Sequence, residues 1–127
     1  MDLGEYFEKT EGLGVLATAD AEGNVDAAVY ARPHVMEDGT VAFIMADRLS
    51  YRNLSDNPKA AYLFVEKGQG YKGKRLYLSK TGEESDQQVV ESMRRRQRKD
   101  YQVDKAKSRV VYFKVKKVRA LVGDDLE

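Results

Sequence analysis

Four short apolar segments separated by turn-forming residues fill the first half of this chain and restrict what it can fold into. They are residues 13–19, 25–35, 40–46 and 60–65. The connections at residues 20–24 and 37–39 are short and rich in Asp, Glu and Gly. Segments of this length, joined by turns this short, pair as antiparallel strands. The spacing therefore predicts a sheet built mostly from hairpins.

Two other segments have the 3.6-residue period of amphipathic helices. Leu3, Tyr6 and Phe7 lie on one side of a short helix expected over residues 2–10. Residues 83–102 contain neither glycine nor proline, begin with acidic residues and end with basic ones, as the helix dipole favours. The second segment is expected to form a helix of roughly five turns.

Two further strands are expected at residues 74–80 and 108–122. Along the second of these, Val115 and Val118 belong to apolar runs of opposite parity, so a β-bulge near Lys116 and Lys117 is needed to reconcile them. The chain thus has a mainly β fold with inserted helices. Six antiparallel strands of this kind are expected to close into a small barrel.

The segment at residues 40–46 is apolar on both faces. Val41, Phe43 and Met45 alternate with Ala42, Ile44 and Ala46. If the first set packs into the core, the second set also needs a cover, because an exposed apolar face of this kind is rare on a monomer. A second subunit would supply that cover.

The composition is that of an ordinary folded protein and excludes several kinds of site. Hydrophobic residues make up 42% and charged residues 34%, and the net charge of +1 provides no global field for nucleic acid or an anionic membrane. The absence of cysteine excludes thiolate sites, and one histidine excludes a multi-histidine metal site. A single cytoplasmic domain over residues 1–127, without a membrane segment, is expected.

Polar groups follow one another along the second expected strand. Its odd positions, from Val25 to Val35, are all apolar and are expected to face the core, whereas Tyr30, Arg32 and His34 occupy even positions. An aromatic ring, a guanidinium and an imidazole on one face can form a binding site. An exposed strand face without a ligand explains the same pattern.

The stretch after the apolar segment at residues 40–46 offers a second candidate site. A helix that begins near Ser50 would present free backbone N–H groups and the positive end of its dipole, which suit a phosphate, and Arg48 and Arg52 add positive charge. The Ser50 hydroxyl could equally cap the helix with nothing bound. The residues alone leave both interpretations open.

The most basic run, Arg94 to Arg96 and its neighbours, has only Tyr101 nearby. Binding of single-stranded nucleic acid needs aromatic rings among the basic residues, so a solvated helix end is favoured and no nucleic-acid partner is expected.

Three stretches together are typical of a known family. The segments GVLATADAEGNVDAAV, DGTVAFIMAD and NLSDNPKAAYLF resemble the pyridoxamine 5'-phosphate oxidase-like FMN-binding split-barrel family over about residues 8–82. The resemblance implies a split β-barrel and a homodimer that holds FMN at the subunit interface. It also implies an oxidoreductase that exchanges hydride or electrons with a small-molecule donor or acceptor.

The resemblance also implies which residues contact FMN. They are Tyr30, Arg32, Pro33 and His34 from the second strand, Ile44, Met45 and Ala46 from the third, and Arg48, Leu49, Ser50, Arg52 and Asn53 from the turn. Tyr71 and Lys72 of the glycine-rich loop would reach across from the partner. No catalytic side chain is implied, because the flavin is the reactive group.

The chain departs from the family at two points. Many members have a serine followed two residues later by a lysine at the phosphate, whereas this chain has Arg48 and then Ser50. The second strand offers Arg32 alone in place of the arginine and lysine of the oxidases that act on vitamin B6, so that activity is not expected. The alternatives are a non-catalytic flavin carrier or sensor, a haem or deazaflavin protein in which His34 serves haem, and an interaction module that uses Arg94 to Arg96.

Overall fold

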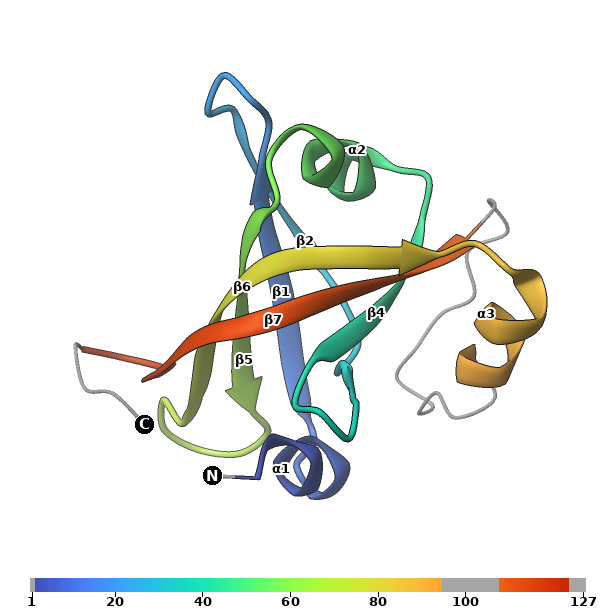
Figure 1. Ribbon diagram of the computed structural model, residues 1–127. Coiled ribbons are helices and arrows are strands. Elements are labelled where there is room, and N and C mark those ends of the chain that lie inside the picture. Colours follow the sequence, from blue (N-terminus) through green and yellow to red (C-terminus); the bar gives the residue numbers. More distant parts are fainter. Residues whose placement is uncertain (1, 95–107, 124–127) are drawn as a thin grey trace.

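The computed structural model describes residues 2–94 and 108–123, which form one seven-stranded antiparallel sheet and three helices (Figure 1). In chain order the elements are α1 (Leu3–Lys9), β1 (Gly12–Ala19), β2 (Val25–Val29), β3 (His34–Val35), β4 (Val41–Ala46), α2 (Leu49–Asp56), β5 (Lys59–Glu66), β6 (Gly73–Glu84), α3 (Gln87–Arg94) and β7 (Ser108–Ala120). The sheet order is β2-β1-β5-β6-β7-β4-β3. The mainly β split-barrel class expected from the sequence is confirmed. No helix within the described ranges is long and apolar enough to cross a membrane.

The barrel is split between β2 and β3, which lie at the two edges of the sheet. The sequence predicts one strand over residues 25–35, but residues 30–33 are not part of a strand and connect the two edges. Pro33 has no N–H with which to continue a ladder, and it is fully buried. This break makes seven strands from the six that were expected.

The core fills the barrel, and α1 and α2 close its two ends (Figure 1). From α1, the Phe7 ring packs edge-on against Phe64 with 5.3 Å between centroids, and α2 contributes Leu54. Gly14 of β1 makes room for the buried Tyr62, whose hydroxyl donates to the carbonyl oxygen of Tyr30 at 3.1 Å. A side chain at Gly14 would collide with that hydroxyl.

The second face of β4 is covered within the chain. Ala42 and Ile44 pack with Val90 and Met93 of α3 and with Val110 of β7. A partner subunit is therefore not needed to cover this strand, contrary to the sequence-based expectation. The reason is that α3 carries its own apolar stripe, which folds back onto β4 and β7.

The predicted long helix begins later than expected. Residues 83 and 84 still belong to β6, where they pair with Val111 and Val110 of β7, and α3 begins at Gln87. Ladder hydrogen bonds thus override local helix propensity there. The expected helical residues 95–102 lie outside the described residues.

The face assignment of the second strand is also wrong. Val25 and Val29 are 83% and 68% exposed, whereas Asp26 and Ala28 are partly buried. The register of the β1–β2 ladder decides this, because it pairs Ala28 with the buried Leu16. Alternation in an edge strand identifies two faces but does not say which of them points inward.

The β-bulge predicted near Lys116 and Lys117 is confirmed. The β6–β7 ladder pairs Tyr77 with Lys117 and the next residue, Leu78, with Val115. Lys116 is the extra residue, and the two apolar runs of β7 both reach the core as a result.

Candidate functional site

The polar stretch after β4 forms a tight turn and then a helix. The backbone N–H of Arg48 donates to the carbonyl oxygen of Ala46 at 2.8 Å, and α2 starts at Leu49. Ser50 lies within the first turn of α2 and is 3% exposed, so it does not cap the helix. The N-cap residue is Arg48, and its side chain makes no capping hydrogen bond. The first turn of α2 therefore lacks the side-chain acceptor that most helices have.

Two side-chain contacts hold α2 in place, one with β1 and one with the turn that precedes the helix. The Asn53 amide donates to the Thr18 hydroxyl at 3.1 Å inside the protein, which ties the helix to β1. The Arg52 Nε lies 3.2 Å from a carboxylate oxygen of Asp47 at the surface. An exposed pair of this kind contributes little to stability but orients the arginine along the turn.

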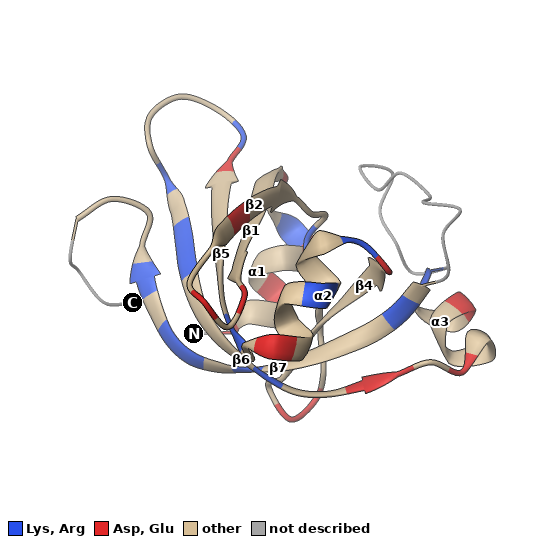
Figure 2. Ribbon diagram, turned by 90° about the horizontal axis from the view of Figure 1, so that it is seen from above, with Lys and Arg blue, Asp and Glu red and all other residues tan. Residues whose placement is uncertain are grey.

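A cluster of charged side chains joins the first turn of α2 to β6 and β7. The Tyr51 hydroxyl donates to Glu83 at 2.8 Å, and the Lys80 ammonium lies 2.9 Å from the other Glu83 oxygen. The Arg109 guanidinium lies 4.6 Å from the centre of the Tyr51 ring and 3.9 Å from Glu83. Figure 2 shows blue basic segments on α2, in the turn before it and at the start of β7.

The environment shifts two pKa values in this cluster. Burial raises the pKa of Tyr51, and its hydrogen bond to the Glu83 carboxylate raises it further. Burial acts to raise the pKa of Glu83 as well, but hydrogen bonds from Lys80 and Tyr51 outweigh it and lower that pKa below the usual 4.5. Near neutral pH the cluster therefore holds a neutral phenol and a carboxylate between two cations.

The Arg109 guanidinium has one unsatisfied hydrogen-bond donor. Its Nη1 is buried and has no hydrogen-bond partner. The β4–β7 ladder pairs Arg109 with Met45, next to the end of β4, so this donor lies beside the start of α2. A buried unsatisfied donor costs free energy that a bound acceptor would recover.

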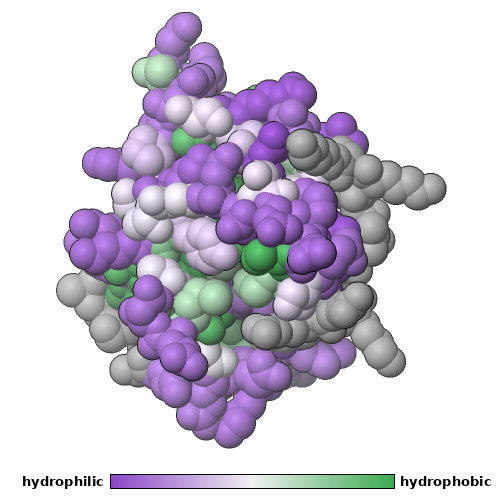
Figure 3. Space-filling view, turned by 45° about the vertical axis from the view of Figure 1, so that its right-hand side comes forward, coloured by the Kyte–Doolittle hydropathy of each residue, from purple (hydrophilic) through white to green (hydrophobic). Residues whose placement is uncertain are grey.

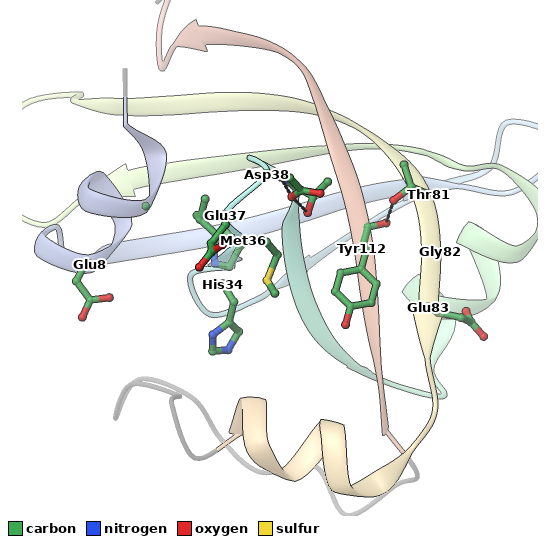
Figure 4. A pocket seen from close by; sticks show the side chains of 13 residues that line it. Glu8, His34, Met36, Glu37, Asp38, Thr81, Gly82, Glu83 and Tyr112 are labelled. Atoms are coloured by element: carbon green, nitrogen blue, oxygen red, sulfur yellow. Dashed lines mark hydrogen bonds between the residues drawn. The ribbon is translucent and has the colours of Figure 1, made fainter.

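A hollow of about 1030 Å³ lies between α1, the β3–β4 turn and the ends of β6 and β7 (Figure 4). His34, Met36 and Tyr112 project into the same region, with Glu8 on one side and Glu83 on the other. Figure 3, which brings the α3 side forward, shows apolar surface between hydrophilic rims on this part of the molecule. Glu83 lines the hollow and also accepts the hydrogen bond from Tyr51, so this side chain connects the edge of the hollow with the first turn of α2.

Comparison with known proteins identifies the family that has this architecture. The family model described as pyridoxamine 5'-phosphate oxidase matches residues 5–122. The chain belongs to this family. Among curated protein sequences, none matches it significantly.

Three solved structures show the same fold. An FMN-binding protein from Syntrophomonas wolfei is 17% identical with a TM-score of 0.73, and the match covers 94% of this chain and 84% of that one. An F420 reductase is also 17% identical with a TM-score of 0.73, over 93% and 97% of the two chains. A haem-binding protein from Mycobacterium smegmatis is 22% identical with a TM-score of 0.59, over 93% of this chain and 51% of that one.

The family fold brings most of the predicted FMN-contacting residues to β4 and its two ends. Ile44 and Met45 are buried within β4, Met45 in the barrel core and Ile44 under α3, so their side chains are committed to packing. Tyr30 and His34 flank a small crevice beside Ala42. Ala46, Leu49 and the other turn residues lie at the opposite end of the strand, where Leu49 is 54% exposed.

Arg32 has a structural partner in this family member. Its guanidinium donates to the carbonyl oxygens of Phe7 at 3.2 Å and Thr10 at 2.6 Å, at the end of α1. A cation at a helix C-terminus is favourable for both the hydrogen bonds and the dipole. A contact between Arg32 and FMN stays a prediction.

Tyr71 and Lys72 lie at the opposite end of the barrel from the predicted residues in the turn after β4. They belong to the loop between β5 and β6, at the α1 end of the barrel, whereas α2 closes the other end (Figure 1). Tyr71 is 85% exposed. A contact of these two residues with FMN from a partner chain stays a prediction.

The sequence pattern does not single out Lys80, Glu83 or Arg109. No local motif marks them, and only the pairing of β6 with β7 and of β7 with β4 brings them to α2. Tyr51, three residues before Leu54 on the helix, is the one member whose local spacing points toward the core.

The lowered pKa of Glu83 predicts an acid-dependent loss of stability. A carboxylate with a depressed folded-state pKa contributes stability above its unfolded pKa and loses it as the pH falls through the folded value. Between about pH 6 and pH 3, wild-type protein should therefore lose more free energy of unfolding than Glu83→Gln. At pH 7 the variant should be less stable by at most about 1 kcal/mol, because the pair is partly exposed.

Urea unfolding at each pH measures this difference. Glu22→Gln, in an exposed turn, is the matched control and should follow the wild-type profile. Parallel profiles for wild type and Glu83→Gln would contradict the assignment.

Proposed function

We propose that this protein binds FMN non-covalently and acts as a small oxidoreductase toward a small-molecule electron donor or acceptor. The observation that carries the proposal is the start of α2, where the helix has no side-chain cap and basic residues surround it. A cytoplasmic location stays a prediction.

The residues at this point suit a phosphate group. The backbone N–H groups of the first turn and the positive end of the α2 dipole favour an anion. Arg48 supplies charge at the surface, and the buried Nη1 of Arg109 supplies a donor without a partner. Ser50 would contribute mainly its backbone N–H, because its side chain is buried.

The chain would supply position and electrostatics for the rest of the cofactor. FMN, when bound, exchanges hydride or electrons through its ring system. The hollow between Glu83 and His34 has room for the rings, and its lining mixes Val35, Met36 and Tyr112 with polar and acidic side chains. The Tyr51 hydrogen bond to Glu83 would hold the first turn of α2 in place for the phosphate.

The outer face of β2, β1 and β5 supports the homodimer. Its residues Leu13, Val15, Val25, Ala27, Val29 and Leu63, here called the apolar outer face, all project away from the barrel core. Val15 pairs with Val29 on one side and with Leu63 on the other, so the side chains form a continuous lattice. A contiguous apolar face on three strands indicates an interface, and a second copy of the same face fits it.

Loss of the basic side chain at Arg48 should weaken the binding of FMN far more than the binding of riboflavin, which lacks the phosphate. We expect Arg48→Ala to raise the Kd for FMN by about tenfold or more and to leave riboflavin nearly unchanged. Fluorescence titration of the purified apoprotein measures both constants. Lys67→Ala, an exposed cation at the α1 end, is the control and should leave both unchanged. Equal losses of affinity for FMN and riboflavin in Arg48→Ala would contradict a contact between Arg48 and the phosphate.

A charge in the apolar outer face should separate the subunits. We expect Val29→Lys to sediment as a monomer and to bind FMN more weakly, because an interface site is incomplete in one chain. Val122→Lys is a matched control, since Val122 is 63% exposed outside this face. Analytical ultracentrifugation decides the question, and an unchanged dimer in Val29→Lys would reject this interface.

Haem is a second candidate ligand, because His34 lies in the hollow beside Met36 and both side chains can ligate iron. Purified protein should show flavin absorption under the first proposal and a Soret band under this one. His34→Ala should abolish the Soret band and leave flavin absorption in place. A deazaflavin would give neither of these spectra.

A further inference from the structure

A second basic region lies on the outer surface of the β6–β7 ribbon, at the opposite end of β7 from Arg109. The described residues that line it are Arg75, Tyr77, Lys116, Lys117 and Arg119, and they surround a cleft of about 410 Å³. None of these described residues is acidic. Figure 2 shows blue segments gathered on β6 and on the end of β7 in this region. We call it the basic cleft.

The β-bulge builds the basic cleft. Successive residues of a regular strand point to opposite faces, so a regular β7 would carry only one of two adjacent lysines here. Lys116 is the extra residue of the bulge, and both Lys116 and Lys117 are exposed. Val115 and Val118, on either side, pack against the core. Bulges commonly re-aim side chains in this way beside binding sites.

The strand pairing gathers basic side chains at the cleft. The ladder places Arg75 directly opposite Arg119, and Tyr77 stands opposite Lys117. A chain with a net charge of +1 thus concentrates four basic side chains around one cleft. A phosphate group matches this local excess of positive residues.

The two arginines are held in place by contacts within the protein. Arg75 Nε donates to the carbonyl oxygen of Ala120 at 2.8 Å, and its Nη2 donates to the carbonyl oxygen of Gly123. The Arg119 guanidinium lies 5.9 Å from the centre of the Tyr77 ring. Oriented guanidinium groups flanked by lysines form a donor set suited to phosphate oxygens.

We propose that the basic cleft binds the phosphate or diphosphate group of a small phosphorylated ligand, at a site separate from the start of α2. The cleft volume lies within the usual range for small-molecule sites. A nucleic acid is disfavoured, because the overall charge is near neutral and only one aromatic residue lies in the cleft.

Inorganic pyrophosphate is the probe, and isothermal titration calorimetry is the measurement. The protein is saturated with FMN, which occupies the start of α2. If it does not bind FMN, the titrations use the Arg48→Ala background, in which the affinity of the start of α2 for an anion is weakened. We expect one pyrophosphate per chain and a loss of about tenfold or more in affinity for Lys117→Ala/Arg119→Ala. Failure of FMN binding therefore leaves this test intact.

Lys114→Ala is the matched control, because Lys114 is an exposed lysine of β7 that does not line the cleft. It should retain wild-type affinity. Pyrophosphate should also raise the melting temperature of the wild type but not of Lys117→Ala/Arg119→Ala. The residues after Gly123 include Asp124 and Asp125, which lie outside the described residues, and Asp124→Asn/Asp125→Asn should bind at least as tightly as the wild type.

Three results would overturn the proposal. They are no heat of binding at millimolar pyrophosphate, an equal loss in Lys114→Ala and in the double variant, and tighter binding of a single-stranded oligonucleotide than of pyrophosphate through the same residues. The last result would assign the cleft to nucleic acid instead.

Discussion

The burial of β4 on both faces is the constraint on which the candidate site depends. One face packs into the barrel around Phe43 and Met45, and the other lies under α3. Hydrogen-bonded neighbours on both sides, β7 and β3, leave the strand no freedom to shift. The turn at its end therefore presents the start of α2 at a fixed place, which is the property that an anion site requires.

The start of α2 and the basic cleft share a physical feature. Each of them gathers basic groups. One combines an uncapped helix with a buried donor of Arg109 that has no partner, and the other places Arg75 and Arg119 in directly opposed positions. Arrangements of this kind are expected where a ligand completes the structure. By contrast, side chains satisfy backbone groups at both ends of α1, where Asp2 accepts from the Glu5 N–H and Arg32 donates to the Thr10 carbonyl oxygen.

Local patterns predicted most of the elements because they depend on short-range physics. Alternating residues and turn formers located β1, β4, β5 and β7, and the parity change along β7 located the bulge at Lys116. The sequence patterns did not predict three features, because each of them depends on a partner that is distant in sequence. The inward face of β2 depends on its register with β1, the late start of α3 on the β6–β7 ladder, and the cover over Ile44 on the folding back of α3.

The candidate site divides in the same way. The sequence by itself determined the turn, the helix after β4, the basic residues Arg48 and Arg52, and the family, because these lie within one continuous segment and its motifs. Only the tertiary structure decided that Arg109 and Glu83 meet Tyr51 at that helix and that Arg32 donates to carbonyl oxygens at the end of α1. The spacing of residues within a segment is enough to predict whether it forms a strand, a turn or a helix. Which side chains of β6, β7 and α2 meet depends on strand pairing between residues far apart in sequence.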